Sequence, residues 1–375
     1  MRLKPNVLIL TDWFSPGYKA GGPIQSVRNL IEHLGNDVDF TIITGDCDLN
    51  DEKQYAVDCF DKWIDIDDCR VCYTSKLNRS RVIRRELKNT QYTCIYLNSL
   101  FSKDFSLYPL FYGRKLGVLD KIILAPRGML GWGALRLKPK KKKLFLALFK
   151  FLKIHKSIAF HSTDSTESMD IKTILGSEIK LSEIFNLPAN LKPRSPTCHS
   201  KPIKFVFASR VSPKKNLDFA IKTLSALNQP ICLDIFGAIE ENSYWETCKS
   251  LASDKIRLTY HGSLKHRDLI DQISNAHFFI LPTLNENFGH AIVESMSIGL
   301  PVIISDQTPW SDIENIGAGR VVPLNDSENW LDVLKECVSM SDEEYQVMCQ
   351  NSIRFVQHRI NINEICMIYR KLFHA

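Results

Sequence analysis

One stretch near the C-terminal third, Leu281 to Ser305, constrains the fold more than any other part of the sequence. An apolar run ends at Leu281, a polar loop follows, and the apolar spacing then predicts a helix from about Phe288–Gly289. Gly299-Leu300-Pro301 ends that helix before a β-branched strand, Val302 to Ile304. Strand, loop, helix and strand in this order form the unit of a parallel α/β sheet, where ligands bind at the C-terminal ends of strands.

Two carboxylates bracket this loop and helix. Glu286 lies on the loop, and Glu294 lies about two turns into the helix. Gly289 lets a ligand approach the backbone closely, and a helix N-terminus offers free N–H groups to an anion. For an isolated pair, the ordinary interpretation is that Glu286 caps the helix and Glu294 lies on its solvated face. The residues described next favour a binding role instead.

Length and composition indicate a soluble chain of two domains. The 375 residues exceed one ordinary core, and 44% apolar with 24% charged residues are values of a globular protein. No run reaches the length of a membrane span, and the first residues form a polar lead into a strand rather than a signal peptide. The eleven scattered cysteines are typical of reduced thiols in the cytosol.

Strands and helices alternate along the chain without a fixed repeat, which predicts two doubly wound α/β domains. The predicted division is a first domain over residues 1–195, a second over 196–356 and a terminal helix within 357–375. Residues 47–85 have weak periodicity, and their elements cannot be ordered. Neither domain begins with a G-x-G-x-x-G loop, so a nicotinamide cofactor has little support.

Basic residues and glycines follow the first strand of each half. Arg210 and Lys215 come just after the strand Phe205–Ser209, and a guanidinium fork with an ammonium suits a diphosphate. In the first half, Gly21-Gly22 precedes a helix and can bring backbone amides to a phosphate. Taken singly, two basic loop residues are usually solvated, and a Gly-Gly pair is a common turn.

Together these residues resemble glycosyltransferase family 4, the retaining enzymes that use nucleotide sugars. Glu286 and Glu294 match its E-x7-E signature, Arg210 and Lys215 its diphosphate-binding pair, and Gly21-Gly22 its N-terminal glycine loop. The resemblance covers most of the chain. It implies the α/β GT-B fold, in which two Rossmann-like domains face a central cleft and the last helix crosses back to the first domain.

The resemblance also implies roles for residues. Glu286 contacts hydroxyls of the donor sugar, and the backbone of Phe288-Gly289-His290 lies beside the sugar and phosphates. Glu294 accepts hydrogen bonds from the ribose hydroxyls, a role that suits an acceptor-only carboxylate. Arg210 and Lys215 neutralise the diphosphate as it leaves. No cofactor or metal is expected, and the DxD spelling of Asp65-Ile-Asp67 lies in a poorly patterned acidic stretch.

Retention in this family does not follow the paired-carboxylate scheme of glycosidases. The resemblance implies a front-face reaction in which the departing phosphate oxygen takes the acceptor's proton, so no protein nucleophile is named. Many relatives place a histidine of the first domain near the reacting carbon. Here Arg127, in Ala125-Pro-Arg-Gly-Met-Leu130, is the candidate. His161 is the alternative, although a histidine at such a place is more often structural.

A basic segment, which we define as residues 136–156, contains no acid. Lys140, Lys141, Lys142 and Lys143 begin a run in which leucines and phenylalanines interleave with further lysines. Such a segment is typical of a protein that binds an anionic membrane surface, or the pyrophosphate of a lipid-linked acceptor. The alternative is that the apolar side is core and the lysines are merely solvated. No recognised nucleic-acid motif accompanies the charge.

The sequence therefore predicts a cytoplasmic glycosyltransferase, peripheral on the inner face of the membrane, that retains configuration. Its partners would be a nucleotide sugar and a glycan or polyprenyl-diphosphate-linked acceptor, in the synthesis of capsule, exopolysaccharide or O-antigen. Three alternatives stay open. A sugar phosphorylase would need free phosphate, a nucleotide-sugar epimerase would convert donor without acceptor, and an idle homologue would only bind nucleotide or glycan.

Overall fold

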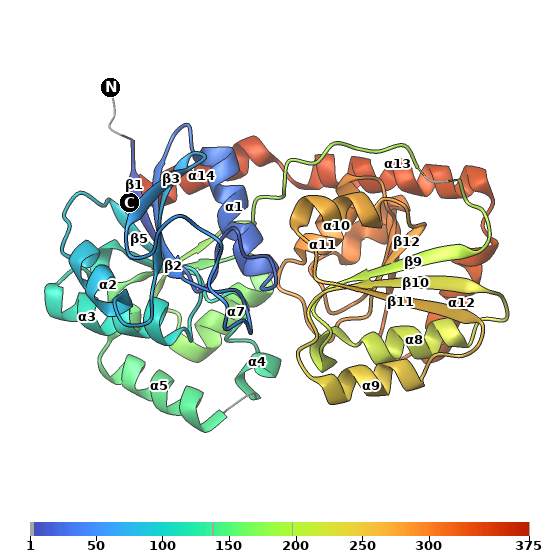
Figure 1. The fold of residues 1–375 in the computed structure, drawn as a ribbon, viewed down its shortest axis with the longest axis horizontal. Helices are drawn as coiled ribbons and strands as arrows, with labels where there is room; N and C mark the ends of the chain where they lie inside the picture. The colour runs from blue at the N-terminus through green and yellow to red at the C-terminus, as the bar shows by residue number, and fades with distance from the viewer. Residues whose placement is uncertain (1–3, 137–138, 197, 375) are drawn as a thin grey trace. The chain divides into compact units, whose positions relative to one another are not determined.

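The computed structural model of the chain describes residues 4–136, 139–196 and 198–374. It divides into two compact units, one formed by Met1–Leu187 with Ile362–Ala375 and the other by Pro188–Asn361 (Figure 1). The predicted divisions lay at residues 195 and 356. The first division falls earlier because the buried carbonyl of Leu187 accepts a hydrogen bond from Asn29, which ties the chain up to that point to the first unit.

The described part of the first unit contains an eight-stranded sheet in the order β3-β4-β2-β1-β5-β6-β7-β8. Its strands are β1 (Asn6–Leu10), β2 (Asp39–Gly45), β3 (Trp63–Ile66), β4 (Cys69–Thr74), β5 (Cys94–Leu97), β6 (Ile122–Leu124), β7 (Ala159–Ser162) and β8 (Lys180–Glu183). All neighbours are parallel except β3 and β4, which form an antiparallel hairpin at the edge.

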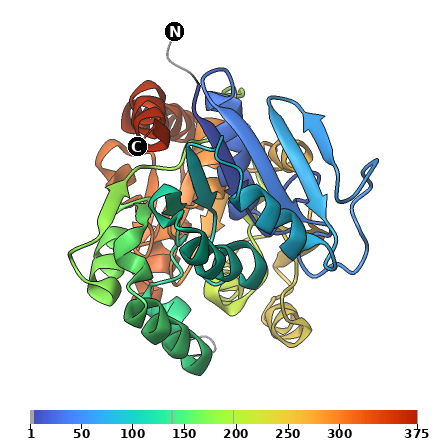
Figure 2. The same cartoon turned by 90° about the vertical axis from the view of Figure 1, so that its left-hand side faces the viewer.

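Helices cover both faces of this sheet (Figure 2). They are α1 (Gly22–Leu34), α2 (Arg79–Leu87), α3 (Tyr108–Leu116), α4 (Trp132–Arg136), α5 (Pro139–Phe151), α6 (Ile154–Ser157), α7 (Ser165–Leu175) and α14 (Ile362–His374), with short helices η1 (Lys103–Leu107) and η2 (Leu119–Lys121). The region from residue 47 to 85, which the sequence left unordered, thus holds β3, β4 and most of α2.

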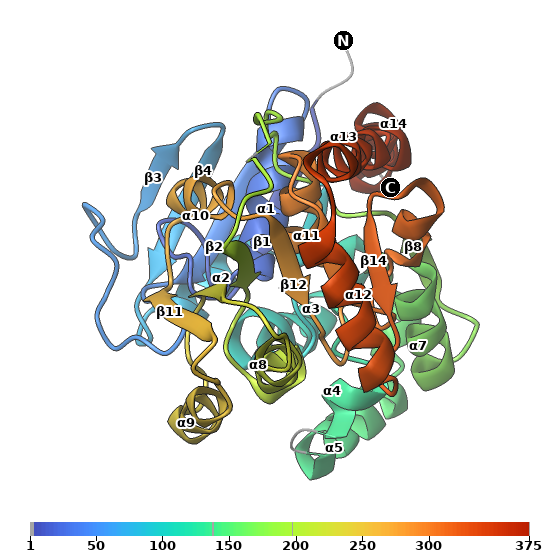
Figure 3. The ribbon, with the colours of Figure 1, turned by 90° about the vertical axis from the view of Figure 1, so that its right-hand side faces the viewer.

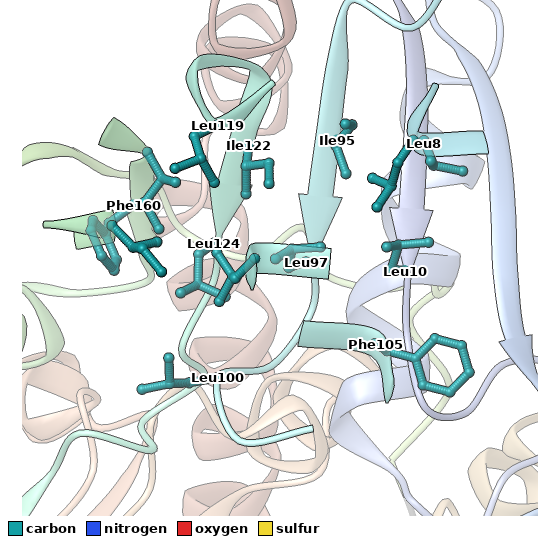
Figure 4. Packing of buried hydrophobic residues seen from close by; sticks show 14 of the residues in the cluster. Leu8, Leu10, Ile95, Leu97, Leu100, Phe105, Leu119, Ile122, Leu124 and Phe160 are labelled. Atoms are coloured by element: carbon teal, nitrogen blue, oxygen red, sulfur yellow. The ribbon is translucent and has the colours of Figure 1, made fainter. Parts of the chain in front are cut away.

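Alternation along the strands sends side chains to two different cores. Leu8, Ile95 and Leu97 join the apolar cluster drawn in Figure 4, where β1, β5 and β6 meet the helices of one face. Tyr96, between two of them on β5, points to the other face and meets the ring of Phe373 on α14 at 6.0 Å. The C-terminal helix belongs to the first unit because its apolar stripe is buried there, as the family resemblance implied.

The described part of the second unit contains a six-stranded, fully parallel sheet in the order β11-β10-β9-β12-β13-β14. Its strands are β9 (Ile203–Ala208), β10 (Ile231–Phe236), β11 (Ile256–Gly262), β12 (Phe278–Leu281), β13 (Val302–Ser305) and β14 (Gly319–Val322). Buried strands of this kind read as continuous apolar runs, which is why the sequence located them.

The helices of the second unit lie on both faces of its sheet. Figures 1 and 3 show α8 (Leu217–Ser225), α9 (Asn242–Ser250) and α12 (Ser327–Ser339) on one face, and α10 (His266–Ile273) and α11 (His290–Ser297) on the other. The remaining helices are α13 (Asp342–Arg359), η3 (Pro213–Lys215) and η4 (Ser311–Ile316). The helix that the sequence predicts from about Phe288–Gly289 is α11. It begins at His290, because Gly289 is its N-cap.

Both sheets contain a topological switch point. In the first sheet the strand order reverses between β1 and β5, and in the second it reverses between β9 and β12. Ligands of open α/β sheets bind outside the carboxyl ends of the strands at such a point, because the two following loops diverge there. The loops after β1, β5, β9 and β12 therefore carry the candidate site residues.

Candidate functional site

The switch point of the second sheet brings two predicted site residues together. Lys215 follows β9, Glu286 follows β12, and their side chains form an ion pair that is largely shielded from solvent, with side-chain exposures of 9% and 16%. The two loops are also joined through their backbones, since Leu284 N–H donates to the carbonyl of Lys214 at 2.9 Å. The sheet and this backbone hydrogen bond therefore hold the two side chains close together.

Glu286 is ionised in this environment. Burial favours the neutral acid, but the Lys215 ammonium and its hydrogen bond hold the pKa of Glu286 below its ordinary value of 4.5. Its backbone N–H donates to the carbonyl of Gln307 at 2.9 Å, which fixes the loop on the side of β13. The site therefore presents a fixed carboxylate and a fixed ammonium at one strand edge.

Arg210 lies on the same edge but pairs with a different carboxylate. Its guanidinium contacts Glu240, in the loop after β10, and 40% of the arginine side chain remains exposed. Glu240 was not predicted from the sequence. Its position in the loop that follows a strand of the same parallel sheet is the signal that could have identified it, because all such loops lie at the edge formed by the carboxyl ends of the strands.

The turn into α11 is built around Gly289. This residue has φ +77°, in the left-handed region, and a Cβ added there would lie 2.9 Å from Cδ1 of Ile292 and 3.0 Å from Cγ of Glu286. Phe288 is buried, and its carbonyl accepts from the indole N–H of Trp310. The Phe288 ring also packs against His290 at 4.8 Å. These contacts fix the backbone that the family resemblance places beside a donor.

We expect Gly289→Ala to destabilise the second unit by about 1–3 kcal/mol, since it combines left-handed strain with contact against Ile292 and Glu286. Gly262→Ala is the matched control, because Gly262 also has a left-handed φ (+72°) but open space around its Cβ. Urea unfolding of both variants measures the difference. Equal losses in the two variants would contradict the proposed contact.

Glu294 points from the second turn of α11 to the start of α10. It is buried, and its Oε1 lies 2.9 Å from Nε2 of His266. The alternative interpretation, in which Glu294 lies on a solvated helix face, is therefore excluded. His266 was not predicted. It begins the helix that follows β11, and residues that follow the strands of a parallel sheet lie at one edge. This edge rule could therefore have identified His266, as it could have identified Glu240.

The switch point of the first sheet carries the glycine loop. Gly21 has φ +65° and no atom within 4 Å of an added Cβ, and α1 begins at Gly22. The preceding loop is fixed by Asp48, whose Oδ2 accepts from the backbone N–H groups of Tyr18 (2.7 Å) and Lys19 (3.0 Å). The open face of Gly21 is compatible with the close approach of a ligand.

Arg127 is held inside the first unit by three hydrogen bonds. Its guanidinium donates to Asn98 Oδ1 at 2.8 Å, to Asn186 Oδ1 and to Tyr96 OH at 3.0 Å. The backbone of Arg127 has a φ of +56°, in the left-handed region. Asn98 in turn donates to the carbonyl of Pro23 at 3.0 Å. The side chain of Asn98 therefore links Arg127 to the start of α1, next to the glycine loop. Asn98 is a further edge residue that was not predicted, although it directly follows β5.

His161, the alternative to Arg127, is fully buried. Its ring nitrogens lie 2.6 Å from Tyr96 OH and 2.9 Å from the carbonyl of Ile184, and Tyr369 OH of α14 lies 3.3 Å away. Burial, together with the charge of Arg127, lowers the pKa of His161 to about 3, so the ring is neutral. This geometry favours the structural interpretation of His161.

The DxD spelling does not lie near these residues. Asp65 is in β3, and Asp67 is in the turn that leads to the first residue of β4, at the edge of the sheet opposite the carboxyl ends. Among the described residues, no group of three His, Cys, Asp or Glu side chains is arranged to hold a metal ion. Cys69 and Cys72 are both buried within β4.

The predicted basic lysines do not all face the same way. Lys140, Lys141 and Lys143 are exposed on α5, whereas Lys142 donates to the carbonyl of Ala134 at 2.6 Å and its ammonium lies 4.9 Å from the ring of Phe101. Lys138 of the basic segment lies outside the described residues. No helix in the described ranges is both long and apolar enough to cross a bilayer.

Comparison with known proteins gives one match to a family model, within the second unit. Residues 190–355 match the family model of glycosyl transferases group 1, and this segment contains Arg210, Lys215, Glu286 and Glu294. No curated protein matches the chain.

Solved structures match over the whole chain. Sucrose-phosphate synthase from Thermosynechococcus elongatus gives a TM-score of 0.73 at 16% identity, covering 99% of both chains. HepE from Anabaena, solved with UDP and glucose, gives a TM-score of 0.72 at 13% identity, and the match covers 98% of this chain and 99% of that one. A glycosyltransferase from Rickettsia africae gives 0.64 at 14% identity, covering 99% and 98%. The fold is therefore GT-B, with two Rossmann-like α/β domains, as the resemblance implied.

Proposed function

We propose that this chain is a retaining glycosyltransferase that moves a sugar from a nucleoside-diphosphate sugar to a glycan acceptor. The observation that carries the proposal is the Lys215–Glu286 ion pair at the switch point of the second sheet. It lies within the segment that matches group 1 glycosyl transferases. The Anabaena relative, whose solved structures contain UDP and UDP-glucose, supports a nucleotide sugar as the donor.

The charges of the second unit suit a diphosphate leaving group. Lysine has three N–H donors, so Lys215 can keep one on Glu286 and direct the others to phosphate oxygens. Arg210 offers a planar fork and is partly exposed, which leaves its other donors accessible to a ligand. Fixed cations at the place where negative charge develops supply electrostatic stabilisation without reorganisation.

Glu286 is better suited to hold the donor sugar than to act as a base. Its ionised oxygens are acceptors only and would take hydrogen bonds from sugar hydroxyls. A carboxylate whose pKa is lowered accepts protons poorly, because general bases work best with a pKa near the operating pH. The proton of the acceptor therefore needs another destination.

In the proposed step the donor phosphate is that destination. The bond between the anomeric carbon and the phosphate oxygen breaks while the acceptor oxygen bonds to the same face of that carbon. The acceptor's proton passes to the departing phosphate oxygen, which Lys215 and Arg210 would stabilise. This scheme requires no carboxylate nucleophile from the protein, and the configuration at the anomeric carbon is retained.

The acceptor side is proposed from the first unit. The glycine loop at Gly21 and the Arg127 network share one switch point, and we propose that this edge of the first unit binds substrate. The lysine-rich α5 favours an acceptor that is linked to polyprenyl diphosphate at the inner face of the cytoplasmic membrane. Such an acceptor belongs to the synthesis of capsule, exopolysaccharide or O-antigen, and no metal is required by the proposed chemistry.

Titration calorimetry of the purified chain with UDP, GDP, ADP and their common sugar conjugates, in EDTA, tests the donor proposal. We expect saturable binding of one nucleotide without metal. Asp65→Ala, at the opposite edge of the first sheet, is the control and should bind like wild type. Absence of binding by every nucleotide would reject the donor proposal and favour an idle homologue.

Turnover of the bound donor then separates the enzyme classes. A transferase consumes donor only when a glycan acceptor is added, and the anomeric configuration of the product, read by NMR, matches that of the donor. Inversion would reject the retaining mechanism. Conversion of donor without acceptor would indicate an epimerase, and a requirement for orthophosphate would indicate a phosphorylase.

A further inference from the structure

Helix α5 has two apolar faces rather than one. Leu146 and Phe149 are buried in the core of the first unit, and the rings of Phe149 and Phe145 stack at 5.3 Å. Leu144, Leu148 and Phe151, in contrast, are 73%, 43% and 81% exposed. Large apolar side chains gathered on one exposed surface usually mark a binding site, whereas single exposed ones do not.

The three exposed side chains form a single stripe. They are spaced four and three residues apart, which places them on one side of the helix, and α5 runs along the margin of the first unit (Figures 1 and 2). We call Leu144, Leu148 and Phe151 the α5 stripe. No polar or acidic residue of the helix interrupts it.

Lysines flank the stripe on both sides. At about 100° per residue, Lys141 lies about 60° to one side of Leu144, and Lys143 and Lys150 lie about 100–120° to the other. All three are exposed, as is Lys140 at the start of the helix. Apolar side chains between two rows of cations characterise a helix that lies in the plane of a membrane interface.

We propose that this face of α5 docks on an anionic lipid bilayer, with the α5 stripe entering the boundary between headgroups and acyl chains. The flanking lysines would then contact the lipid phosphates. This inference deepens the peripheral location in the proposed function by naming the surface and its partner. It uses no residue of the donor site.

Charge selects a bilayer over a second copy of the chain. Two copies that met through the α5 stripe would bring their lysine rows face to face, and juxtaposed like charges oppose such contact. Nucleic acid would use the lysines but leave the stripe in water. An anionic bilayer accommodates both the lysines and the stripe. Each lysine near its surface strengthens binding about fivefold, and its interior accepts the apolar side chains.

Flotation of the full chain with vesicles tests the proposal. Phosphatidylcholine vesicles containing phosphatidylglycerol should bind the wild type, and phosphatidylcholine alone should bind it weakly. Leu144→Ser/Phe151→Ser should weaken binding at least about tenfold. Leu77→Ser is the matched control, since Leu77 is 95% exposed but lies outside α5, and it should bind like wild type.

Charge variants and an inserted probe complete the test. Lys140→Gln/Lys141→Gln/Lys143→Gln should lose on the order of 100-fold in binding to anionic vesicles and most of its salt dependence. The emission of Phe151→Trp should shift to the blue when anionic vesicles are added.

Absence of vesicle binding by the wild type, or equal binding by Leu144→Ser/Phe151→Ser, would overturn the proposal. So would a wild-type dimer in sedimentation that this variant abolishes, because the stripe would then join two copies. Nucleotide affinity should stay unchanged in every α5 variant. Failure of docking with intact donor binding therefore leaves the proposed transferase function standing, and the reverse result leaves docking standing.

Discussion

Replacing Lys215 by methionine is expected to lower the free energy of unfolding of the second unit by about 3–5 kcal/mol at pH 7. The reason is the partner it leaves behind, since Glu286 would keep its charge in a largely buried position with its nearest cation removed. Urea unfolding followed by circular dichroism and by intrinsic fluorescence measures the loss.

The loss should depend on pH in a definite direction. The folded-state pKa of Glu286 lies below its ordinary value of 4.5, so the unfolded chain binds more protons between the two values and stability rises with pH there. The contribution of the ion pair is complete above about 4.5 and disappears as the pH falls through the lowered pKa. The difference between wild type and Lys215→Met should therefore shrink below pH 4.5.

A double-mutant cycle isolates the pair. In Lys215→Met/Glu286→Gln the buried charge is gone, so this double variant should be more stable than Lys215→Met alone. Losses that simply add, or a Lys215→Met deficit that grows as the pH falls below 4.5, would contradict the assignment of a buried ion pair. The turnover rate of Lys215→Met should also fall by roughly 10²–10³-fold if Lys215 stabilises the leaving diphosphate.

The architecture could be predicted because its signals are local. Buried parallel strands appear as short apolar runs, and the loop after each run identifies one edge of a sheet. The hairpin of β3 and β4 escaped prediction for the opposite reason. Trp63–Ile66 is a half-exposed edge strand among aspartates, and the fully paired strand next to it contains Arg70, so neither shows a clean alternation.

The partners of the site residues could not be read from spacing. Glu240 contacts Arg210 across 30 residues of sequence, and His266 contacts Glu294 across 28. Only the strand order brings these partners together. The edge rule would have narrowed the search to residues that follow each strand. It would not have told which side chains pair, because that depends on rotamers and on the turn at Gly289.

Helix α5 shows a further limit of periodicity. Its apolar residues occupy nearly every side of the helix, so no single buried face can be assigned from the sequence. Packing decides which residues are buried. Leu146 and Phe149 enter the core, whereas Leu144 and Phe151 are exposed, so the core interpretation holds for one face of the helix and membrane binding by the other face stays a prediction.

Replacing Glu294 by alanine is expected to raise the Kd for the preferred nucleotide by roughly 10–100-fold, because hydrogen bonds to a charged group contribute about 1.5–3 kcal/mol. The loss should concern the ribose. Wild type should bind the 2′-deoxy nucleotide more weakly than the ribonucleotide, and Glu294→Ala should bind the two alike. Calorimetry with both nucleotides measures this difference.

His266 makes the interpretation sharper. Because it holds Oε1 of Glu294 at 2.9 Å, His266→Ala should weaken ribonucleotide binding less than Glu294→Ala while reducing the discrimination against the deoxy form. Glu336→Ala, an exposed glutamate on α12, is the control and should change neither. A folded Glu294→Ala variant with wild-type affinity for both nucleotides would place the ribose elsewhere. The contact between Glu294 and His266 would then serve only to join α11 to α10, and the E-x7-E spacing would have a structural origin.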